Sequence, residues 1–122
     1  MSAAILIVED EQSIAGLLKD RLDGEGYQVT IAYTGKEAVQ NIKDKRPDVI
    51  TLDIQLPDAN GIKILEKIKA NPETSMIPVI IISSSDEGFS AKEKGAEEFI
   101  PKPINFKKLF ETLSGLNSKI TK

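Results

Sequence analysis

Five side chains that can bind a metal ion or carry charge in a reaction each follow an apolar run of strand length. They are three carboxylates, a hydroxyl and an ammonium group: Glu9, Asp10, Asp53, Ser83 and Lys102. Carboxylates that lie close together raise one another's pKa unless a cation neutralises them. Acids gathered in this way therefore favour a bound metal ion.

The chain can offer such a metal only oxygen ligands, because it contains no cysteine and no histidine. Oxygen ligands suit hard cations, and a few carboxylates with room for water favour Mg²⁺ over Ca²⁺, with Mn²⁺ able to substitute. We expect the ion to bridge Asp53 to an incoming phosphoryl group, as a Lewis acid and an orienting template. Lys102 would add a positive charge opposite, and Ser83 a hydroxyl donor.

The composition is that of one ordinary globular domain. The 122 residues are 40% hydrophobic and 29% charged, and the formal net charge is -3. The lysines are scattered, which argues against direct binding of nucleic acid. The start of the chain lacks the features of a signal peptide, and the apolar runs are too short to cross a membrane. We therefore expect a cytoplasmic protein with no membrane partner.

Apolar runs of strand length alternate with segments of helical periodicity. The expected strands are rich in branched residues and lie at 5–8, 27–33, 48–53, 79–82 and 99–100. Apolar residues at three- and four-residue spacing indicate helices within 14–22, 34–42, 62–68 and 106–116, and a short polar helix is expected between 86 and 94. The second strand has the weaker patterning of an edge strand.

This alternation predicts an α/β fold with a five-stranded parallel sheet, because right-handed crossovers place helices on both faces of the sheet. The carboxyl ends of parallel strands lie at one edge, where open sheets of this class bind ligands. The fold would thus bring the five polar side chains into one shallow pocket. We expect a single domain over 1–116 and a frayed C-terminal tail over 117–122.

Three local signals mark the starts of helices. Thr34 and Glu37 have the spacing of a capping box, and Ser84 and Glu87 repeat that spacing. Asn105 is a candidate cap for the last helix. These signals predict where the second, fourth and fifth helices begin.

The segments ILIVEDE, DVITLDIQLPDANG, PVIIISSS and GAEEFIPKP stand in this order at the expected strand ends. Through them, residues 4–116 resemble a response-regulator receiver domain of bacterial two-component signalling. The resemblance implies a flavodoxin-like sheet with strand order 2-1-3-4-5. It also implies a phosphoprotein whose partners are a histidine kinase or a histidine phosphotransfer protein, and a protein downstream. The domain would be a monomer or a weak homodimer.

The resemblance also assigns roles to individual residues. Asp53 would be the phosphoacceptor that receives the phosphoryl group of a kinase phosphohistidine. Asp10 would bind Mg²⁺ directly, Glu9 would bind it through a water, and the backbone carbonyl of Gln55 would complete the protein ligands with Asp53. Lys102 would contact the phosphoryl oxygens.

A conformational switch is implied as well. Phosphorylation would draw the Ser83 hydroxyl inward, and Phe99 would turn into the space that it leaves. The surface of the fourth helix, fifth strand and fifth helix would shift between two existing populations. Phe99 has no phenolic hydroxyl, so its switch would act by packing. The bond from Lys102 to Pro103 would be cis.

The sequence departs from the family pattern at several places. Glu9 stands where aspartate is commoner. Pro101 falls in a strand, which is tolerable at a sheet edge. The fourth helix is shortened by about one turn, roughly 3.6 residues, and contains Gly88. This last departure affects the surface through which partners and a second copy would bind.

Each assignment has an alternative. Asp53 alone could be a solvated or capping residue, Ser83 could be only a cap, although we give that role to Ser84 or Ser85, and Phe99 could be only a packing residue. For the whole domain, the first alternative is a degenerate receiver that binds a partner without phosphorylation. The second is a phosphohydrolase with an aspartyl nucleophile, which would need a second acid where Gln55 stands. We expect no enzyme, because the domain would catalyse only its own phosphorylation and dephosphorylation.

Overall fold

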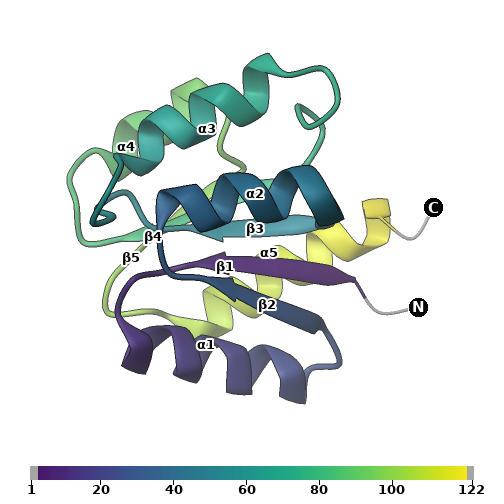
Figure 1. The fold of residues 1–122 in the computed structure, drawn as a ribbon. Helices are drawn as coiled ribbons and strands as arrows, with labels where there is room; N and C mark the ends of the chain where they lie inside the picture. Colours follow the sequence, from purple (N-terminus) through teal and green to yellow (C-terminus); the bar gives the residue numbers. More distant parts are fainter. Residues whose placement is uncertain (1–2, 121–122) are drawn as a thin grey trace.

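The computed structural model describes the backbone of residues 3–120 and the side chains of residues 3–116. Five parallel strands form one sheet in the order β2-β1-β3-β4-β5 (Figure 1). The strands are β1 (Ala4–Val8), β2 (Gln28–Ala32), β3 (Val49–Leu52), β4 (Val79–Ser83) and β5 (Glu98–Pro101). The α/β class and the strand order expected from the sequence are both confirmed.

The helices cover both faces of the sheet, α2, α3 and α4 one face and α1 and α5 the other (Figure 1). Their bounds are α1 (Gln12–Gly24), α2 (Gly35–Lys45), α3 (Gly61–Ala70), α4 (Gly88–Ala91) and α5 (Phe106–Ile120), with a 3₁₀ turn η1 (Lys92–Lys94) after α4. Within the described part of the chain, no helix is both long and apolar enough to span a membrane.

Successive strand residues point to opposite faces, so the core has two halves. Leu6 and Val8 belong to the half beneath α2, α3 and α4, whereas Ile5 and Ile7 belong to the half beneath α1 and α5. Every residue of β3 and β4 is buried. The continuous apolar runs are therefore strands covered on both faces. Pro101, the last residue of β5, is exposed at the edge of the sheet, where its missing N–H is tolerated.

The register of the strands brings their carboxyl ends together. Val8 pairs with Leu52, and Ser83 pairs with Pro101. The amide of Asp53 continues the ladder by donating to the carbonyl of Val8 over 3.0 Å, and the amide of Lys102 donates to the carbonyl of Ser83 over 3.1 Å. The polar residues at the ends of these strands must therefore lie along one edge of the sheet.

Two helix caps expected from the sequence are present. The Thr34 hydroxyl accepts from the amide of Glu37 over 3.1 Å, and the Asn105 side chain accepts from the amide of Lys108 over 3.1 Å. The Glu37 carboxylate accepts from the amide of Tyr33, whereas in a capping box it would accept from the amide of Thr34. The return hydrogen bond of the motif is therefore displaced by one residue.

The cap expected at Ser84 is absent. Instead, Ser85 accepts from the amide of Glu87 over 3.2 Å, and Ser84 is exposed. Ser85 does not cap the helix either, because α4 follows Glu87, whose side chain makes no capping hydrogen bond, so both expected caps are wrong. The turn from β4 is tight enough that the amide of Ser85 also donates to the Ser83 hydroxyl, over 3.2 Å.

The last helix is longer than expected. It runs to Ile120, whereas the sequence pattern predicted its end at Leu116 and a frayed tail over 117–122. The predicted end at Leu116 is therefore too early, because no glycine or proline in 117–120 breaks the helix. The last two positions of the expected tail, 121 and 122, lie outside the described residues.

The fourth helix is short, as the sequence predicted. It has a single turn, and its Gly88 lies directly against the ring of Phe99. A Cβ at this position would overlap that ring. Phe89 packs edge-on against the same ring, with the centroids 5.1 Å apart. The absence of a side chain at Gly88 thus lets the short helix approach β5 closely.

Candidate functional site

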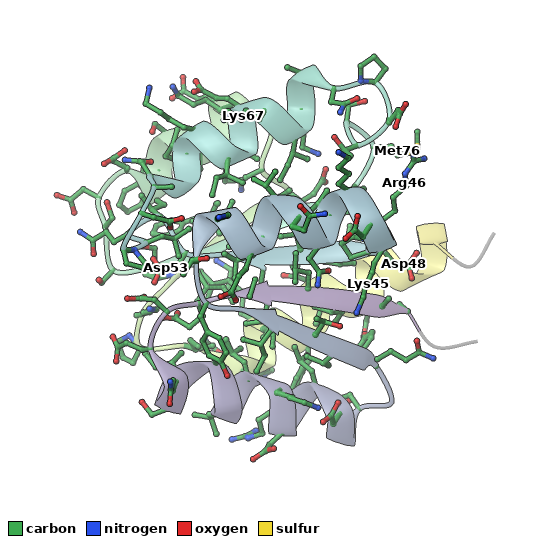
Figure 2. All side chains as sticks on the ribbon, viewed as in Figure 1. Lys45, Arg46, Asp48, Asp53, Lys67 and Met76 are labelled. Carbon is green, nitrogen blue, oxygen red and sulfur yellow. The ribbon has the colours of Figure 1, made fainter. Side chains whose placement is uncertain are left out.

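Three carboxylates converge at the carboxyl edge of the sheet. Glu9 and Asp10 follow β1, Asp53 follows β3, and one oxygen of each lies within 4.8 Å of the others. Figure 2 labels Asp53 at this edge and Asp48 toward the opposite end of the sheet. Glu9 and Asp53 are buried, whereas Asp10 is exposed. The cluster therefore opens to solvent on the side of Asp10.

Lys102 joins two of the three carboxylates. Its Nζ lies 2.8 Å from Oε1 of Glu9 and 2.9 Å from Oδ2 of Asp53, and its side chain is 14% exposed. Burial lowers the pKa of Lys102, but the hydrogen bonds to Glu9 and Asp53 outweigh burial, so the pKa is raised above 10.5. The lysine is thus a fixed positive charge between two acids that come from different strands.

Glu9 is the most buried of the acids. Burial raises its pKa above the ordinary 4.5, and Asp53 adds to that rise, although hydrogen bonds from Lys102 and the amide of Glu11 act in the opposite direction. That amide donates to Oε2 over 3.0 Å. Both oxygens of Glu9 therefore have a donor within the protein, which suits a role in metal binding through a water.

Asp53 is held by the backbone on both sides. Its own amide donates a hydrogen bond to the carbonyl of Val8 in β1, and its Oδ1 accepts from the amide of Gln55 over 3.1 Å. The other oxygen, Oδ2, faces Lys102. Each carboxylate oxygen therefore has one donor and a fixed direction, while the backbone of Gln55 stays next to the carboxylate.

Two further expected site residues are also buried. Ser83 is fully buried, and its hydroxyl accepts from the amide of Ser85 rather than bonding Asp53. Phe99 is buried, with its ring packed against Phe89. The peptide bond from Lys102 to Pro103 is cis, as expected. The structure thus joins Glu9, Asp10, Asp53 and Lys102 in direct proximity. Ser83 and Phe99 are buried on the neighbouring strands β4 and β5.

The loop from β3 to α3 contains site residues that sequence reasoning did not identify. Asn60 is the N-cap of α3, and its side chain accepts from the amide of Ile62 over 2.8 Å. The amide of Gly61 donates to the carbonyl of Ile54 over 2.6 Å. A Cβ on Gly61 would overlap the carbonyl oxygen of Asp53 and lie 2.8 Å from Cα of Ile54. Glycine is therefore required for α3 to start against the backbone of Asp53.

Replacing Gly61 with alanine should displace the backbone that carries Asp53. We expect Gly61→Ala to lower the free energy of unfolding by about 1–3 kcal/mol, the usual cost of overpacking, as measured by urea denaturation. Gly16→Ala is the matched control, because a Cβ on Gly16, in the middle of α1, meets nothing within 4 Å. That control should stabilise the fold. Equal stability of Gly61→Ala and wild type would contradict the close approach.

Asp58 fastens the same loop to α2. Its carboxylate accepts from the amide of Gly35 over 2.7 Å and from the amide of Lys36 over 3.0 Å. These are free N–H groups of the first turn of α2, where a negative charge is favourable. The two hydrogen bonds lower the pKa of Asp58 below 3.8. Asp58 therefore links the loop that follows Asp53 to a helix distant in the chain.

The lowered pKa of Asp58 gives a pH dependence with a definite sign. A carboxyl whose pKa falls on folding stabilises the fold above its unfolded pKa, 3.8, and loses that contribution as the pH drops through its folded value. We expect Asp58→Asn to be less stable than wild type at pH 7, with a gap that closes below pH 3.8. Urea denaturation across this range measures the gap, and Asp20→Asn, which changes an exposed carboxylate of α1, is the control. A gap that persists unchanged in acid would contradict this role.

The comparisons with known proteins agree with this geometry. Residues 5–114 match the family model described as "Response regulator receiver domain". The chain is 34% identical over 108 residues to the alkaline phosphatase synthesis transcriptional regulatory protein PhoP of Bacillus subtilis, covering 86% of this chain and 44% of the relative. It is 35% identical over 119 residues to the response regulator PleD of Caulobacter vibrioides, covering 95% of this chain and 26% of the relative. The chain thus spans less than half the length of both relatives.

Solved structures lead to the same family. The signal receiver domain of a signal transduction histidine kinase from Syntrophus aciditrophicus has a TM-score of 0.90 at 33% identity, over 99% of this chain and 94% of that chain. A CheY-like response regulator receiver domain protein from Methanospirillum hungatei has a TM-score of 0.89 at 30% identity, over 99% and 98%. The acidic edge, the strand order and the matched family model thus point the same way, and the chain belongs to the response regulator receiver domain family.

Proposed function

We propose that the domain takes a phosphoryl group from the phosphohistidine of a histidine kinase, or of a histidine phosphotransfer protein, onto Asp53. The observation that supports this most is the convergence of Glu9, Asp10 and Asp53 on one edge with Lys102 bridging two of them. A lone acid at a strand end has many roles. Three acids and a partly buried ammonium group within a few ångströms suit a divalent cation and a phosphate together.

The three carboxylates fit a hard cation, because they supply only oxygen ligands and one of them faces solvent. We assign Asp10 and Asp53 as direct ligands of Mg²⁺, Glu9 as a ligand through a water, and the backbone carbonyl of Gln55 as the last protein ligand. Mn²⁺ would occupy the same position. When bound, the ion would supply Lewis acidity toward the phosphoryl oxygens.

In the transfer step, a carboxylate oxygen of Asp53 forms a bond to phosphorus as the bond from phosphorus to the imidazole nitrogen breaks. The electron pair of that bond leaves with the imidazole. Lys102, which already lies 2.9 Å from Asp53, balances charge on the transferred oxygens. Asp53 is consumed as acceptor and restored by hydrolysis, so the domain modifies itself and turns over no separate substrate. In this sense we do not class it as an enzyme.

The switch that we propose starts at Ser83. Its hydroxyl, which now accepts from the amide of Ser85, would turn to donate to a phosphoryl oxygen on Asp53. The ring of Phe99 is already buried in this structure. Its role in the switch would therefore be a shift in the equilibrium between this inward position and an outward one. Gly88 affects that equilibrium, because its missing side chain makes room for the ring. A downstream protein would bind the altered surface of α4, β5 and α5.

Nothing observed favours the two alternatives. A degenerate receiver would not need these residues together. Here the carboxylate of Asp10 and the ammonium group of Lys102 both lie close to the carboxylate of Asp53. A phosphohydrolase would need an acid in the place of Gln55. We propose that 1–116 form the signalling domain, as a monomer or a weak homodimer.

Metal binding gives a test that does not need a kinase. We expect Mg²⁺ to raise the melting temperature, and at a free concentration ten times its Kd to add about 1.4 kcal/mol to the free energy of unfolding. Differential scanning fluorimetry measures the shift. Asp10→Asn, which removes the exposed carboxylate of the cluster, should abolish most of it. An equal shift in that variant would mean that Mg²⁺ binds elsewhere.

The phosphorylated state can be imitated with beryllofluoride. With Mg²⁺ present, ¹⁵N NMR spectra should show amide shifts at Ser83 and along β5, and no such shifts in Asp53→Asn. Shifts that survive in that variant, or their absence in wild type, would count against the acceptor role.

A further inference from the structure

A groove lies between α2 and α3, away from the sheet. It has two sections, with volumes of about 330 Å³ and about 120 Å³. Both sections are lined by Val39, Ile64 and Lys67, so they are continuous (Figure 2 labels Lys67 on α3). We call this the α2–α3 groove. It is separate from the carboxyl edge of the sheet and takes no part in the chemistry proposed for Asp53.

The floor of the α2–α3 groove is apolar. Ile42, Ile64 and Ile68 belong to the core beneath and are at most 6% exposed, whereas Val39 is 47% exposed. The floor is therefore rigid, because most of its side chains are fixed by the core. An apolar surface of this shape is stabilised when another apolar side chain covers it.

The rim of the α2–α3 groove is positively charged. Lys36 and Lys43 line it from α2 and Lys67 lines it from α3, and no carboxylate of the described residues lines either section. Among residues 3–116, none of the three amines lies within ion-pair distance of an acid. The chain as a whole carries a net charge of -3, so this concentration of lysines runs against the overall composition.

The acids near the groove are engaged elsewhere. Glu37 and Asp44 of α2 line a different recess against β2. Glu66 of α3 pairs with Lys94 of the 3₁₀ turn over 3.0 Å. Asp58 is close enough to Lys36 to interact with its charge, but its two oxygens accept from the first amides of α2. Positive potential therefore remains over the apolar floor, mainly from the lysines farther along the groove.

We propose that the α2–α3 groove binds an acidic amphipathic helix of a partner protein. Apolar side chains at helical spacing would cover Val39 and the isoleucine floor, and carboxylates on the flanks of the helix would face Lys36, Lys43 and Lys67. The groove follows α2, which has 11 residues, and α3, which has 10. At 1.5 Å per residue it is about 15 Å long, so it suits a segment of about ten residues.

A negatively charged membrane surface is a weaker fit to the same charges. Binding at a membrane interface needs apolar side chains that protrude into the acyl layer. Here the isoleucines are recessed between two helices, and of the four apolar floor residues only Val39 is substantially exposed. A narrow recessed floor between basic rims matches a single helix better than a plane of headgroups.

The test uses a fluorescein-labelled, terminally blocked peptide of about a dozen residues, with leucines at helical i, i+3, i+4 and i+7 positions and glutamates elsewhere. Fluorescence anisotropy at low salt should show saturable binding, and ¹⁵N NMR should place the shifted amides on α2 and α3. The same peptide with glutamine in place of glutamate should bind at least several-fold more weakly. Vesicles of phosphatidylserine and phosphatidylcholine, assayed by sedimentation, should leave the domain in solution.

Three variants make the assignment specific. Lys67→Glu and Val39→Glu should each weaken peptide binding roughly five- to tenfold, because each places a charge of the wrong sign at the groove. Lys107→Glu makes the same charge change as Lys67→Glu on exposed α5 and should alter binding less than about twofold. Phosphorylation of Asp53 should proceed at the wild-type rate in all three variants. A failure of the groove proposal can therefore be distinguished from a failure of the acceptor role.

Several results would overturn the proposal. They are the absence of amide shifts on α2 and α3 at saturating peptide, an effect of Lys107→Glu as large as that of Lys67→Glu, and sedimentation with anionic vesicles in the absence of peptide binding. The last result would assign the groove to a membrane surface instead.

Discussion

Asp53→Asn is expected to abolish phosphoryl incorporation while leaving the fold intact. Asparagine has the same shape as aspartate, but its amide is not a nucleophile toward phosphorus. The variant keeps a hydrogen-bond acceptor for the amide of Gln55, and Lys102 keeps its contact with Glu9 at 2.8 Å. Incubation with acetyl phosphate and Mg²⁺, followed by intact-protein mass spectrometry, should therefore show no phosphorylated species.

The control for this variant is Asp20→Asn, which makes the same change on the exposed face of α1. It should be phosphorylated at the wild-type rate, and both variants should give the wild-type circular dichroism spectrum. Phosphorylation of Asp53→Asn at an appreciable rate would place the acceptor elsewhere.

Lys102→Met is expected to have two opposite effects. Phosphorylation should slow by about 10²–10³-fold, the usual cost of removing one group that stabilises charge in a transition state. Mg²⁺ binding should become several-fold tighter, because Lys102 now neutralises Glu9 and Asp53 at 2.8 and 2.9 Å and repels a divalent ion nearby. Phosphorylation kinetics and calorimetric titration with Mg²⁺ measure the two effects.

The opposition of these two effects separates a role in charge balance from a loss of structure. A variant that merely loosened the site would bind Mg²⁺ more weakly and be phosphorylated more slowly. Lys107→Met, which removes an exposed lysine of α5, should change neither quantity. Weaker Mg²⁺ binding by Lys102→Met would contradict our description of the site.

Sequence alone predicted the parts of the fold that depend on short-range patterns. The unbroken apolar runs of β3 and β4 indicated strands buried on both faces, and parallel strands place the residues after their carboxyl ends at one edge of the sheet. The gathering of Glu9, Asp10, Asp53 and Lys102 was predicted from these two facts. The strand order was not, and it came from the resemblance of four motifs to a known family.

The features that sequence did not reveal depend on contacts between distant segments. Asp58 bonds the start of α2, more than twenty residues earlier in the chain, and Gly61 is needed only because α3 starts against the backbone of Asp53. Aspartate and glycine are both common in turns, so nothing local in the sequence marks these contacts. The early helix end predicted at Leu116 has a local cause, because the apolar pattern ended there while the backbone remained helical to Ile120.

The measurement that bears most directly on phosphoryl transfer is chemical mapping of the modified residue. The domain is treated with acetyl phosphate, with Mg²⁺ or with EDTA, and borohydride then reduces any acyl phosphate to an alcohol that peptide mass spectrometry can locate. We expect conversion of Asp53 alone to homoserine, and only when Mg²⁺ is present. Conversion of another acid, or equal conversion of Asp53 in EDTA, would contradict the proposal that the acidic edge brings a divalent ion and a phosphoryl group together.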